Sequence, residues 1–370
     1  MKPRFLAILS LSFLFVLASA CQPKPACNDP LGCWVFAPAD EIWLAYDQPL
    51  AEPDLQTGKD IRAGLEIFIG SHPDYQKHPL KVFEQTMNCF PGQVERPINY
   101  LTGSPNLVAL VGPACRLDAA LSLRLLNDAG LAVLSPLPLL VEGDYPIWLP
   151  LAPSGRYALR TTVELLKQFF GGEETGWIVE NTPANRFLQQ SLCAQLTLSG
   201  TTCLEPVLVD VGVSDLKPYL SEPILAEASS WVFLYPAATF ANLENLATQM
   251  AGKSSLLLDL DSPMDINPSA PVREYWRIGQ SSQSIPNGFT LQYQKRYNGE
   301  NIEIAYKSYQ AAQVIIQAIT DTANSSRDKS LLLPRQAYYS RLAESTPAPP
   351  EICITRIVNN TLQSRDQKCQ

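Results

Sequence analysis

The sequence predicts an α/β protein built of two doubly wound lobes, between which the chain crosses more than once. From residue 41 onward, short apolar runs alternate with segments of helical period, a pattern typical of a parallel sheet with crossover helices. The same alternation begins again after the aromatic and proline-rich stretch 145–155. With 370 residues, 46% of them hydrophobic, the chain is long enough to form two hydrophobic cores.

The first part of the chain carries the elements of one lobe. A polar loop at 47–58 separates the first strand from the first helix, Gly130 ends a helix, and Pro136 ends a strand. The predicted strands are 41–46, 80–86, 107–112 and 131–136, and the predicted helices are 59–71 and 118–130.

The second part repeats this pattern and then departs from it. Its predicted strands are 175–180, 202–210, 230–236 and 254–261, and its predicted helices are 156–170, 185–200, 215–228 and 238–252. Two long helices without an intervening strand are expected at 287–299 and 303–324, followed by a terminal strand at 351–360.

The first twenty residues have the pattern of a secretory signal peptide. Lys2 and Arg4 precede an apolar segment, 5–17, that is too short to span a membrane, and small residues follow. The stretch ASAC at 18–21 resembles a bacterial lipobox, in which the cysteine is lipidated and becomes the first mature residue. We therefore expect a signal peptide at 1–20 and a linker anchored through Cys21 at 21–40. Plain secretion, with Cys21 as an ordinary thiol, is the alternative.

Nine cysteines in an exported chain leave an even number for disulfides once Cys21 carries lipid. The simplest scheme is four sequential bridges, although eight cysteines allow 105 connectivities. A metal site is the competing interpretation, but CxxC spacing is absent and the chain has only two histidines. The sequential pairs are Cys27 with Cys33, Cys89 with Cys115, Cys193 with Cys203, and Cys353 with Cys369.

Catalytic chemistry has few candidate residues in this sequence. Cys115 follows a Gly-Pro turn where a helix begins, which would make a free thiol reactive, so an envelope hydrolase is one hypothesis. The hypothesis requires a free thiol and a nearby base, and His72 and His78 do not follow a strand. Asp259 and Asp261 could serve a glycosidase, but aspartate at a strand end is more often a loop or cap residue. We expect no enzymatic activity, no cofactor and no metal.

Charge and hydropathy restrict the partners. The net charge of −8 argues against nucleic acid and against anionic membrane surfaces. After the N-terminal segment, no apolar run approaches the length of a membrane span.

In open α/β sheets ligands bind beyond the carboxyl ends of the strands, so residues there are the candidates for binding a ligand. Tyr46 and Tyr235 stand at predicted strand ends.

Three stretches, read in order, resemble the type 1 periplasmic-binding-protein fold and in particular the branched-chain amino-acid-binding proteins of ABC transporters. The stretches are "GKDIRAGLEI", "LVALVGPACRLDAALSLRLLNDAGLAVLSP" and "FTLQYQKRYNGENIEIAYKSYQAAQVIIQAI". The residues that match the family pattern are Thr57, Gly58, Gly64, Gly112, Pro113, Ser135, Pro136, Tyr309 and Ala311, with Gln310 in place of the family's aspartate.

The resemblance implies a binding protein that closes two lobes on a small-molecule solute and presents it to an ABC permease. It also implies a Cys89–Cys115 disulfide, since some family members bridge these two loops. Lobe 1 would comprise 41–151 with 281–340, and lobe 2 would comprise 152–280 with 341–370. We expect a monomer outside the cytoplasm that touches the membrane only through its lipid anchor.

The chain departs from the family at the ligand. Arg116 stands where a serine-rich turn would begin, Leu137 to Leu139 replace an Ala-Thr segment, and no Tyr-Gly follows Glu180 and Asn181. Arg116 could instead hold a carboxylate of the solute, with Asp259 or Asp261 binding a cationic group. The predicted ligand-binding set is Tyr46, Thr57, Arg116, Ser135, Asn181, Tyr235, Asp259 and Asp261. The loss of the amino-acid clamp keeps a second hypothesis open, in which the fold serves as a protein-interaction or sensing module of the cell envelope, like the penicillin-binding-protein activators.

Overall fold

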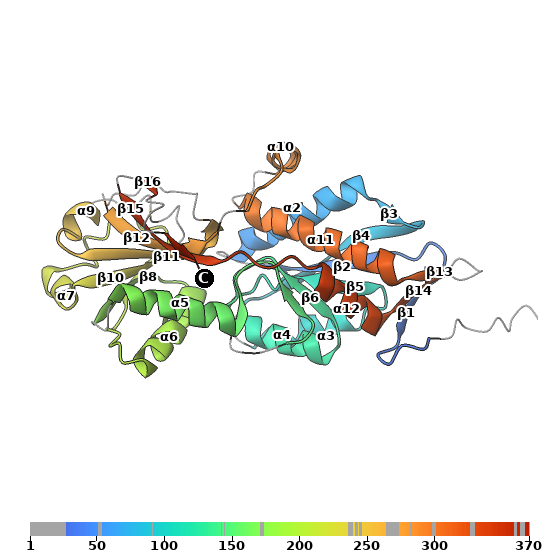
Figure 1. Ribbon diagram of the computed structural model, residues 1–370, viewed down its shortest axis with the longest axis horizontal. Coiled ribbons are helices and arrows are strands. Elements are labelled where there is room, and N and C mark those ends of the chain that lie inside the picture. The colour runs from blue at the N-terminus through green and yellow to red at the C-terminus, as the bar shows by residue number, and fades with distance from the viewer. Residues whose placement is uncertain are drawn as a thin grey trace, which may run out of the picture.

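The computed structural model describes most of the chain after the predicted signal peptide. The described residues are 27–50, 54–90, 92–141, 143, 145–170, 174–235, 240, 243, 246–263, 274–281, 283–297, 301–325, 330–358, 361–362 and 367–369. The signal peptide and Cys21 lie outside them. Among the described helices, none combines the length and apolar character that a membrane span requires. The molecule is elongated, with two α/β lobes along its long axis (Figure 1).

Lobe 1, as we use the term, is the part built around a six-stranded sheet. All neighbouring strands are parallel except for the antiparallel pair β3–β4. The strand order is β3 (Asp74–Tyr75), β4 (His78–Met87), β2 (Ile42–Pro49), β5 (Leu107–Val111), β6 (Ala132–Ser135) and β7 (Trp148–Pro150).

Helices cover both faces of this sheet. α2 (Asp54–Ser71) and α11 (Ile302–Thr322) pack on one face, and α3 (Glu95–Thr102) and α4 (Ala119–Asp128) pack on the other (Figure 1). α10 (Asn287–Arg296) lies outside α2, where the Tyr293 hydroxyl donates to Asp60 Oδ1 at 2.6 Å. The apolar strands and both helix layers form one buried cluster.

The packing of α2 on α11 depends on Gly64. A Cβ atom at this position would lie 2.0 Å from the carbonyl oxygen of Ala305 and 2.9 Å from Ser308 Cβ. Both contacts are shorter than van der Waals distance, so only glycine allows the two helices to approach this closely. This is the physical reason for the glycine that the family resemblance places in the first helix.

Lobe 2 is the part built around the eight-stranded sheet. Its strands β9, β8, β10, β11 and β12 are parallel, and β15 adds to β12 in antiparallel fashion. The strand order is β16 (Thr361–Leu362), β15 (Ile352–Val358), β12 (Glu274–Gln280), β11 (Ser254–Pro263), β10 (Ser230–Leu234), β8 (Thr175–Glu180) and β9 (Val207–Val209), with β17 (Lys368–Cys369) paired to β15.

Two buried clusters lie on opposite faces of this sheet. α5 (Gly155–Phe170) and α6 (Pro183–Leu198) pack on one face, and α7 (Glu222–Ala226) and α9 (Leu246–Gln249) pack on the other. α6 begins at Pro183 because the Thr182 hydroxyl accepts a hydrogen bond from the Asn185 amide, which satisfies one of the free N–H groups of the first turn.

A third, three-stranded sheet closes the far end of lobe 1. β1 (Cys33–Phe36) pairs with β14 (Leu331–Pro334), which also pairs with β13 (Asn324–Ser325). α12 (Arg335–Ser345) follows, and the side chain of Pro334 at its N-cap cannot accept a hydrogen bond. Asp29 caps this helix instead, accepting from the Gln336 amide at 2.9 Å and from the Ala337 amide at 3.3 Å.

The four sequential disulfides expected from the order of the cysteines are present. Cys89–Cys115 joins the loop after β4 to the loop after β5, as the resemblance implies. Cys115 is therefore not a free nucleophile, and the hydrolase hypothesis that required its thiol is wrong. The other bridges are Cys27–Cys33, Cys193–Cys203 and Cys353–Cys369.

The structure differs from the sequence prediction at several elements. α2 begins at Asp54, inside the predicted polar loop, and β1 lies inside the predicted linker. β9 is shorter than predicted because Pro206, which has no N–H, immediately precedes it. β12 is not predicted, since Arg277 interrupts its apolar pattern. The sequence prediction also misses the helices α3 and α12 and the short strands β7 and β14.

The α2–α11 contact gives a first prediction. Gly64→Ala should lower the free energy of unfolding by about 1–3 kcal/mol, the usual cost of overpacking, because the new methyl group meets backbone atoms that cannot rotate away. Gly288→Ala on α10 is the matched control, since a Cβ there has no neighbour within 4 Å. Urea denaturation of both variants measures the difference. Equal stability of the two variants would contradict the close approach at Gly64.

Candidate functional site

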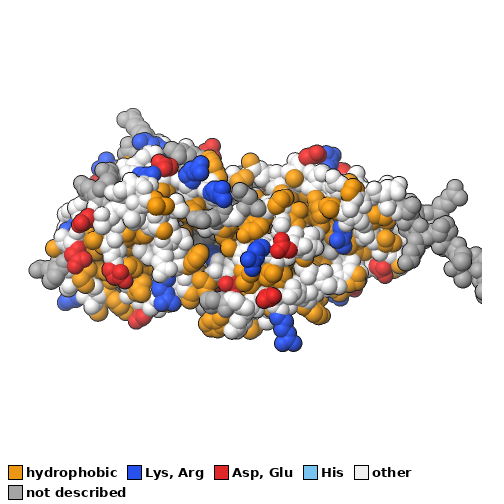
Figure 2. All heavy atoms as spheres, turned by 90° about the horizontal axis from the view of Figure 1, so that it is seen from below, with side chains coloured by type: hydrophobic (Ala, Val, Ile, Leu, Met, Phe, Trp, Pro, Cys, Tyr) orange, Lys and Arg blue, Asp and Glu red, His pale blue; other side chains and the backbone are white. Residues whose placement is uncertain are grey.

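The carboxyl ends of the two sheets meet where the chain passes between the lobes. The Leu151 amide donates to the Ser135 carbonyl at 2.8 Å, so the chain leaves lobe 1 beside the end of β6. In lobe 2, Gln280 ends β12 and pairs with Ile352, the first residue of β15. Both passages therefore lie at the ends of parallel strands, and the two carboxyl ends face one another. The molecular surface is hollowed where the lobes meet (Figure 2).

A buried ion pair lies at this junction. Lys307 Nζ on α11 of lobe 1 is 2.8 Å from Glu303 Oε1 and donates to Gln280 Oε1 of lobe 2 at 2.7 Å. All three side chains are almost fully buried. The Ser281 amide also donates to the Glu351 carbonyl at 2.8 Å, which ties two passages of the chain together. Polar contacts thus join the lobes at this junction, and Leu140 of lobe 1 also packs against the lobe 2 cluster.

The two lobes have the same strand order. Numbering the parallel strands along the chain within each lobe gives 2-1-3-4-5 for β4-β2-β5-β6-β7 and again for β9-β8-β10-β11-β12. In this order the chain reverses direction across the sheet between strands 1 and 3, which is where such folds bind their ligands. The candidate site therefore lies between β2 and β5 in lobe 1 and between β8 and β10 in lobe 2. We call these two places the switch points.

Asp47 fills the lobe 1 switch point. Its side chain is fully buried at the end of β2. The Ala114 amide donates to Oδ1 and Oδ2 of Asp47 at 2.9 and 2.8 Å, and the Cys115 amide donates to Oδ2 at 3.3 Å. Gly112 makes room for the carboxylate, since a Cβ there would lie 2.4 Å from Asp47 Oδ1. The Asp47 carboxylate therefore fixes the loop after β5 through these hydrogen bonds.

Burial dominates the electrostatics of this carboxylate. It raises the pKa of Asp47 to about 6, while the amides of Ala114 and Cys115 oppose the shift by hydrogen bonding to the charged form. The disulfide at Cys115 and the Asp47 hydrogen bonds fix the same loop, which ends at the predicted ligand residue Arg116. Arg116 is half-buried and takes part in interactions within the chain.

The other predicted lobe 1 residues are engaged inside the lobe. The Ser135 hydroxyl is buried and donates to the Leu137 carbonyl at 3.2 Å. The Tyr46 hydroxyl donates to Glu84 Oε2 at 2.5 Å on the α2 side of the sheet, and burial with this contact raises the pKa of Tyr46. Thr57 is buried in the first turns of α2. Ser135 lies at the carboxyl end of the sheet beside the Asp47 loop, whereas Tyr46 lies on the α2 side of the sheet and Thr57 lies in α2 itself.

A row of polar residues marks the lobe 2 switch point. Val179, Leu234 and Leu258 are register partners on β8, β10 and β11. One residue further along each strand, Glu180, Tyr235 and Asp259 therefore stand side by side, about 4.8 Å apart. The residues two positions earlier, Ile178, Phe233 and Leu257, all belong to the cluster on the α7–α9 face, so the row faces the same way.

Two groups at this switch point are buried without a hydrogen-bond partner. The Tyr235 side chain is 2% exposed, and its hydroxyl makes no hydrogen bond to any residue that the structure describes. Burial and the nearby Glu180 carboxylate raise the pKa of Tyr235, so the hydroxyl stays protonated. The second group is the side-chain oxygen of Asn181, beside Glu180. Burial also raises the pKa of Glu180, against a hydrogen bond from the Gly212 amide. An unpartnered buried polar group costs about 1–3 kcal/mol, so each such group calls for a physical explanation, and at a switch point a ligand is one.

Of the two predicted acidic residues on β11, Asp259 has a described side chain. Asp259 Oδ2 lies 4.0 Å from the Arg277 guanidinium, and both side chains are buried. The charge of Asp259 is thus balanced inside the sheet rather than exposed to a solute. Asp261 lies in β11, but its side chain is outside the described part of the structure.

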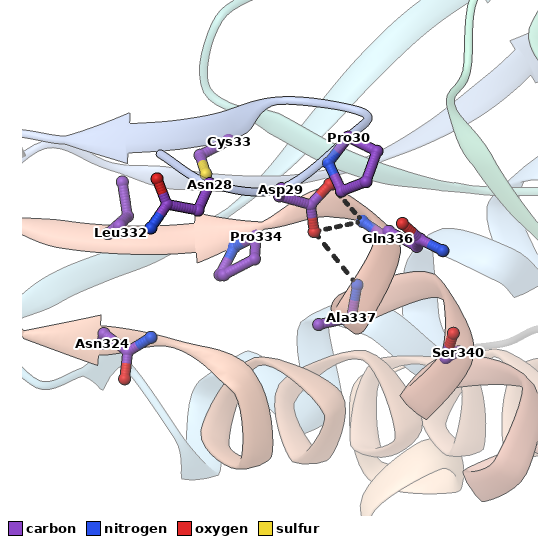
Figure 3. Close-up of a pocket in the computed structure, with 10 residues that line it drawn as sticks. All are labelled: Asn28, Asp29, Pro30, Cys33, Asn324, Leu332, Pro334, Gln336, Ala337 and Ser340. Atoms are coloured by element: carbon purple, nitrogen blue, oxygen red, sulfur yellow. Dashed lines mark hydrogen bonds between the residues drawn. The ribbon is translucent and has the colours of Figure 1, made fainter. Parts of the chain in front are cut away.

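Two further features lie apart from the switch points. A groove of about 550 Å³ at the far end of lobe 1 is lined by residues of the N-terminal segment, β14 and α12, with Asp29 on one wall (Figure 3). The histidines are also remote, since Nδ1 of His72 lies 3.2 Å from the Phe68 carbonyl and Nδ1 of His78 lies 3.0 Å from the Asp40 carbonyl. Within the described ranges, no cluster of three or more His, Cys, Asp or Glu side chains could hold a metal ion.

Sequence reasoning misses Asp47, Glu180 and Arg277. Asp47 directly follows the predicted strand 41–46, and extending that strand by one residue would place it at the carboxyl end of the sheet. Glu180 ends a correctly predicted strand, so its position carries the same signal as that of Tyr235. Arg277 has no such signal, because its strand is not predicted.

The buried Asp47 carboxylate predicts a pH dependence of stability. Because the folded pKa of about 6 lies above the ordinary value of 3.8, the stability that this group contributes is fully present below pH 3.8 and is lost as the pH rises through 6. Asp47→Asn removes this loss. The free energy of unfolding of the variant, relative to the wild type, should therefore rise by about 3 kcal/mol between pH 4 and pH 7. Denaturation at a series of pH values tests this, and a difference that does not change with pH would contradict it.

Comparisons with known proteins support the architecture. The sequence matches no protein-family model and no curated protein. Solved structures with the same fold include the leucine-binding protein LivK of Thermotoga maritima, with a TM-score of 0.58, 12% identity, and coverage of 87% of this chain and 97% of LivK. A solute-binding protein of R. palustris in complex with benzoate has a TM-score of 0.59 and 10% identity, covering 89% of this chain and 95% of its own.

A third similar structure is the branched-chain amino-acid-binding protein LivJ of Streptococcus pneumoniae in complex with isoleucine. Its TM-score is 0.56 at 9% identity, and the match covers 90% of this chain and 99% of LivJ. The likeness extends over nearly the whole of each chain and includes both lobes. The chain therefore has the two-lobed α/β fold of the type 1 periplasmic binding proteins.

Proposed function

We propose that the protein is an extracytoplasmic solute-binding lipoprotein of an ABC transporter, which holds an amino-acid-like or other small polar solute between its lobes. The solute enters at the two switch points, and closure of the lobes about their crossing chains encloses it. Binding needs no cofactor and no chemical step. A permease then takes the solute from the closed monomer.

The observation that carries this proposal is the buried Tyr235 hydroxyl without a hydrogen-bond partner. It lies at the lobe 2 switch point, the kind of position at which doubly wound sheets bind their ligands. The unpartnered Asn181 oxygen lies on the neighbouring strand end. A solute that supplied partners to both groups would recover the free energy that their burial costs. The similar solved structures include proteins that bind leucine, isoleucine and benzoate.

The remaining predicted site residues take supporting places in this proposal. Arg116 stands on the lobe 1 side and Asp261 on the lobe 2 side, whereas Ser135 and Asp259 support the two sides through their contacts with Leu137 and Arg277. The chain crosses between the lobes at 151/152 and 280/281, and a third time after α12 ends at Ser345 and before β15 begins at Ile352, instead of at the expected 340/341, because Leu342 is buried in the lobe 1 cluster. Lobe 1 then comprises 41–151 with 281–345, and lobe 2 comprises 152–280 with 352–370. The signal peptide at 1–20 is removed, and lipid on Cys21 holds the protein at the membrane.

A second function is favoured by one observation. The polar groups of the lobe 1 switch point bond to one another, as the Asp47, Ser135 and Leu139 contacts illustrate. A lobe that satisfies its own polar groups suits a module that binds another envelope protein or senses a signal. In that case the cleft would be a remnant of solute binding, and no small polar solute would bind.

Removal of the Tyr235 hydroxyl distinguishes solute binding from a role in protein interaction or sensing. Tyr235→Phe should stabilise the solute-free protein by about 1 kcal/mol, because it removes an unsatisfied buried hydroxyl, and should weaken solute binding about tenfold. Tyr338→Phe is the matched control, since the Tyr338 hydroxyl is also buried without a partner but lies in α12 of lobe 1. Thermal shifts of both variants are measured with a library of amino acids, amides and short peptides. If the library shifts neither variant nor the wild type, the solute-binding proposal fails.

The lipid anchor has its own test. Cys21→Ser should move the full-length protein from the membrane fraction to the soluble extracytoplasmic fraction, because one acyl-modified cysteine supplies the whole of the anchoring. Fractionation of cells that express either form, followed by detection of the protein, measures the change. A wild-type protein found only in the soluble fraction would contradict lipidation.

A further inference from the structure

We infer that the solute is recognised through hydrogen-bond donors that it presents to lobe 2 and not through a carboxylate bound by lobe 1. The solute class is an amino-acid-like compound in which a hydroxyl, an amide or hydrogen replaces the carboxylate: an amino alcohol, an amino amide or an amine. This inference rests on the proposed function and narrows it. It follows from the different ways in which the two switch points satisfy their polar groups.

The backbone amides of the lobe 1 switch point already hold a carboxylate. The amides of Ala114 and Cys115 converge on Asp47 at 2.8 to 3.3 Å, the geometry with which exposed backbone N–H groups bind an anion. Asp47 is fully buried beneath them, so an external carboxylate cannot replace it. A second carboxylate beside the first would also meet the repulsion of a like charge in a poorly solvated place.

The other polar groups at this end of lobe 1 are engaged as well. The Leu139 amide donates to Ser154 Oγ at 2.9 Å, and the Ser154 hydroxyl donates to the Leu137 carbonyl at 3.0 Å. The Ser135 hydroxyl donates to the same carbonyl. The side chains of Leu137 and Leu139 are buried in the lobe 1 core, which holds this loop against the first passage between the lobes. These backbone and hydroxyl donors are therefore bonded within the chain, and Arg116, which follows Cys115, also takes part in interactions within the chain.

The lobe 2 switch point offers acceptors instead. The Asn181 side-chain oxygen is buried without a partner and can only accept a hydrogen bond. Glu180 is 5% exposed and is a second acceptor, and the Tyr235 hydroxyl stands beside it in the strand register. Asp259 is paired with Arg277, so its charge is balanced, whereas Glu180 meets the Gly212 amide. A solute hydroxyl, which donates and accepts, can satisfy all three groups, an ammonium can donate to the Asn181 oxygen and Glu180, and a solute carboxylate would be repelled by the Glu180 carboxylate.

Matched solutes test the inference directly. Isothermal titration of the full chain is carried out with leucine, leucinol, leucinamide and isoamylamine, and with the corresponding sets built on serine, phenylalanine and lysine. In at least one set, a member without the carboxylate should bind at least tenfold more tightly than its amino acid. If an amino acid binds more tightly than its alcohol, amide and amine, the inference is overturned while the proposed function stands. If no member of any set binds, both fail.

Variants of the two switch points supply an independent measurement. Glu180→Gln should weaken the preferred amine or alcohol at least tenfold, whereas the control Glu205→Gln, at an exposed position of lobe 2, should leave it unchanged. Asp47→Ala vacates the anion-binding amides, so formate should raise its melting temperature in a saturable way but should not do so for the wild type. Asp47→Asn, which keeps the shape of the side chain, should not respond to formate. Equal formate responses of the Ala variant and the wild type would overturn the role given to Asp47.

Discussion

The relative position of the two lobes depends on the buried side chain of Lys307. Lys307 lies between the Glu303 carboxylate and the Gln280 amide oxygen, and all three side chains are buried. Removing an ammonium and a carboxylate from water is costly, and such a pair is tolerated only where the geometry satisfies both partners. Glu303 and Lys307 lie on the same helix, so the contact that crosses between the lobes is the hydrogen bond from Lys307 to Gln280. Sliding of α11 against the end of β12 would break this bond and remove one acceptor from a buried ammonium, so the bond favours the observed position of the lobes.

The carboxyl end of the first strand has a different role in each lobe. Both lobes have the strand order 2-1-3-4-5, and both place a carboxylate at the end of strand 1, Asp47 in lobe 1 and Glu180 in lobe 2. Asp47 is fully buried and binds two amides of its own lobe. Glu180 lies beside a tyrosine hydroxyl and an amide oxygen that have no hydrogen-bond partner. One switch point is thus a structural brace, and the other retains unsatisfied polar groups.

Sequence patterns predict the architecture well and the site in part. The alternation of apolar runs and helical segments predicts both parallel sheets, and the order of the cysteines gives all four disulfides. Tyr235 and Asn181 are found because they follow apolar strands. Asp47 is missed because strand β2 continues past its apolar run. Arg277 is missed because a charged residue interrupts the apolar pattern by which a strand is predicted. Residues buried in pairs, such as Asp259 with Arg277, are recognised only when strands are placed side by side.

The position of β1 decides which lobe lies next to the N-terminus. α11 runs from the junction with Gln280 to the three-stranded sheet, a distance of ~30 Å for 21 residues. β1 pairs with β14 there, and the Cys27–Cys33 disulfide closes a short loop at its start (Figure 1). In the proposed lipoprotein the anchor would therefore be attached at the end of lobe 1 that is farthest from lobe 2. Lobe 2, with the unpartnered groups of Tyr235 and Asn181, would then be the lobe that lies farther from the membrane.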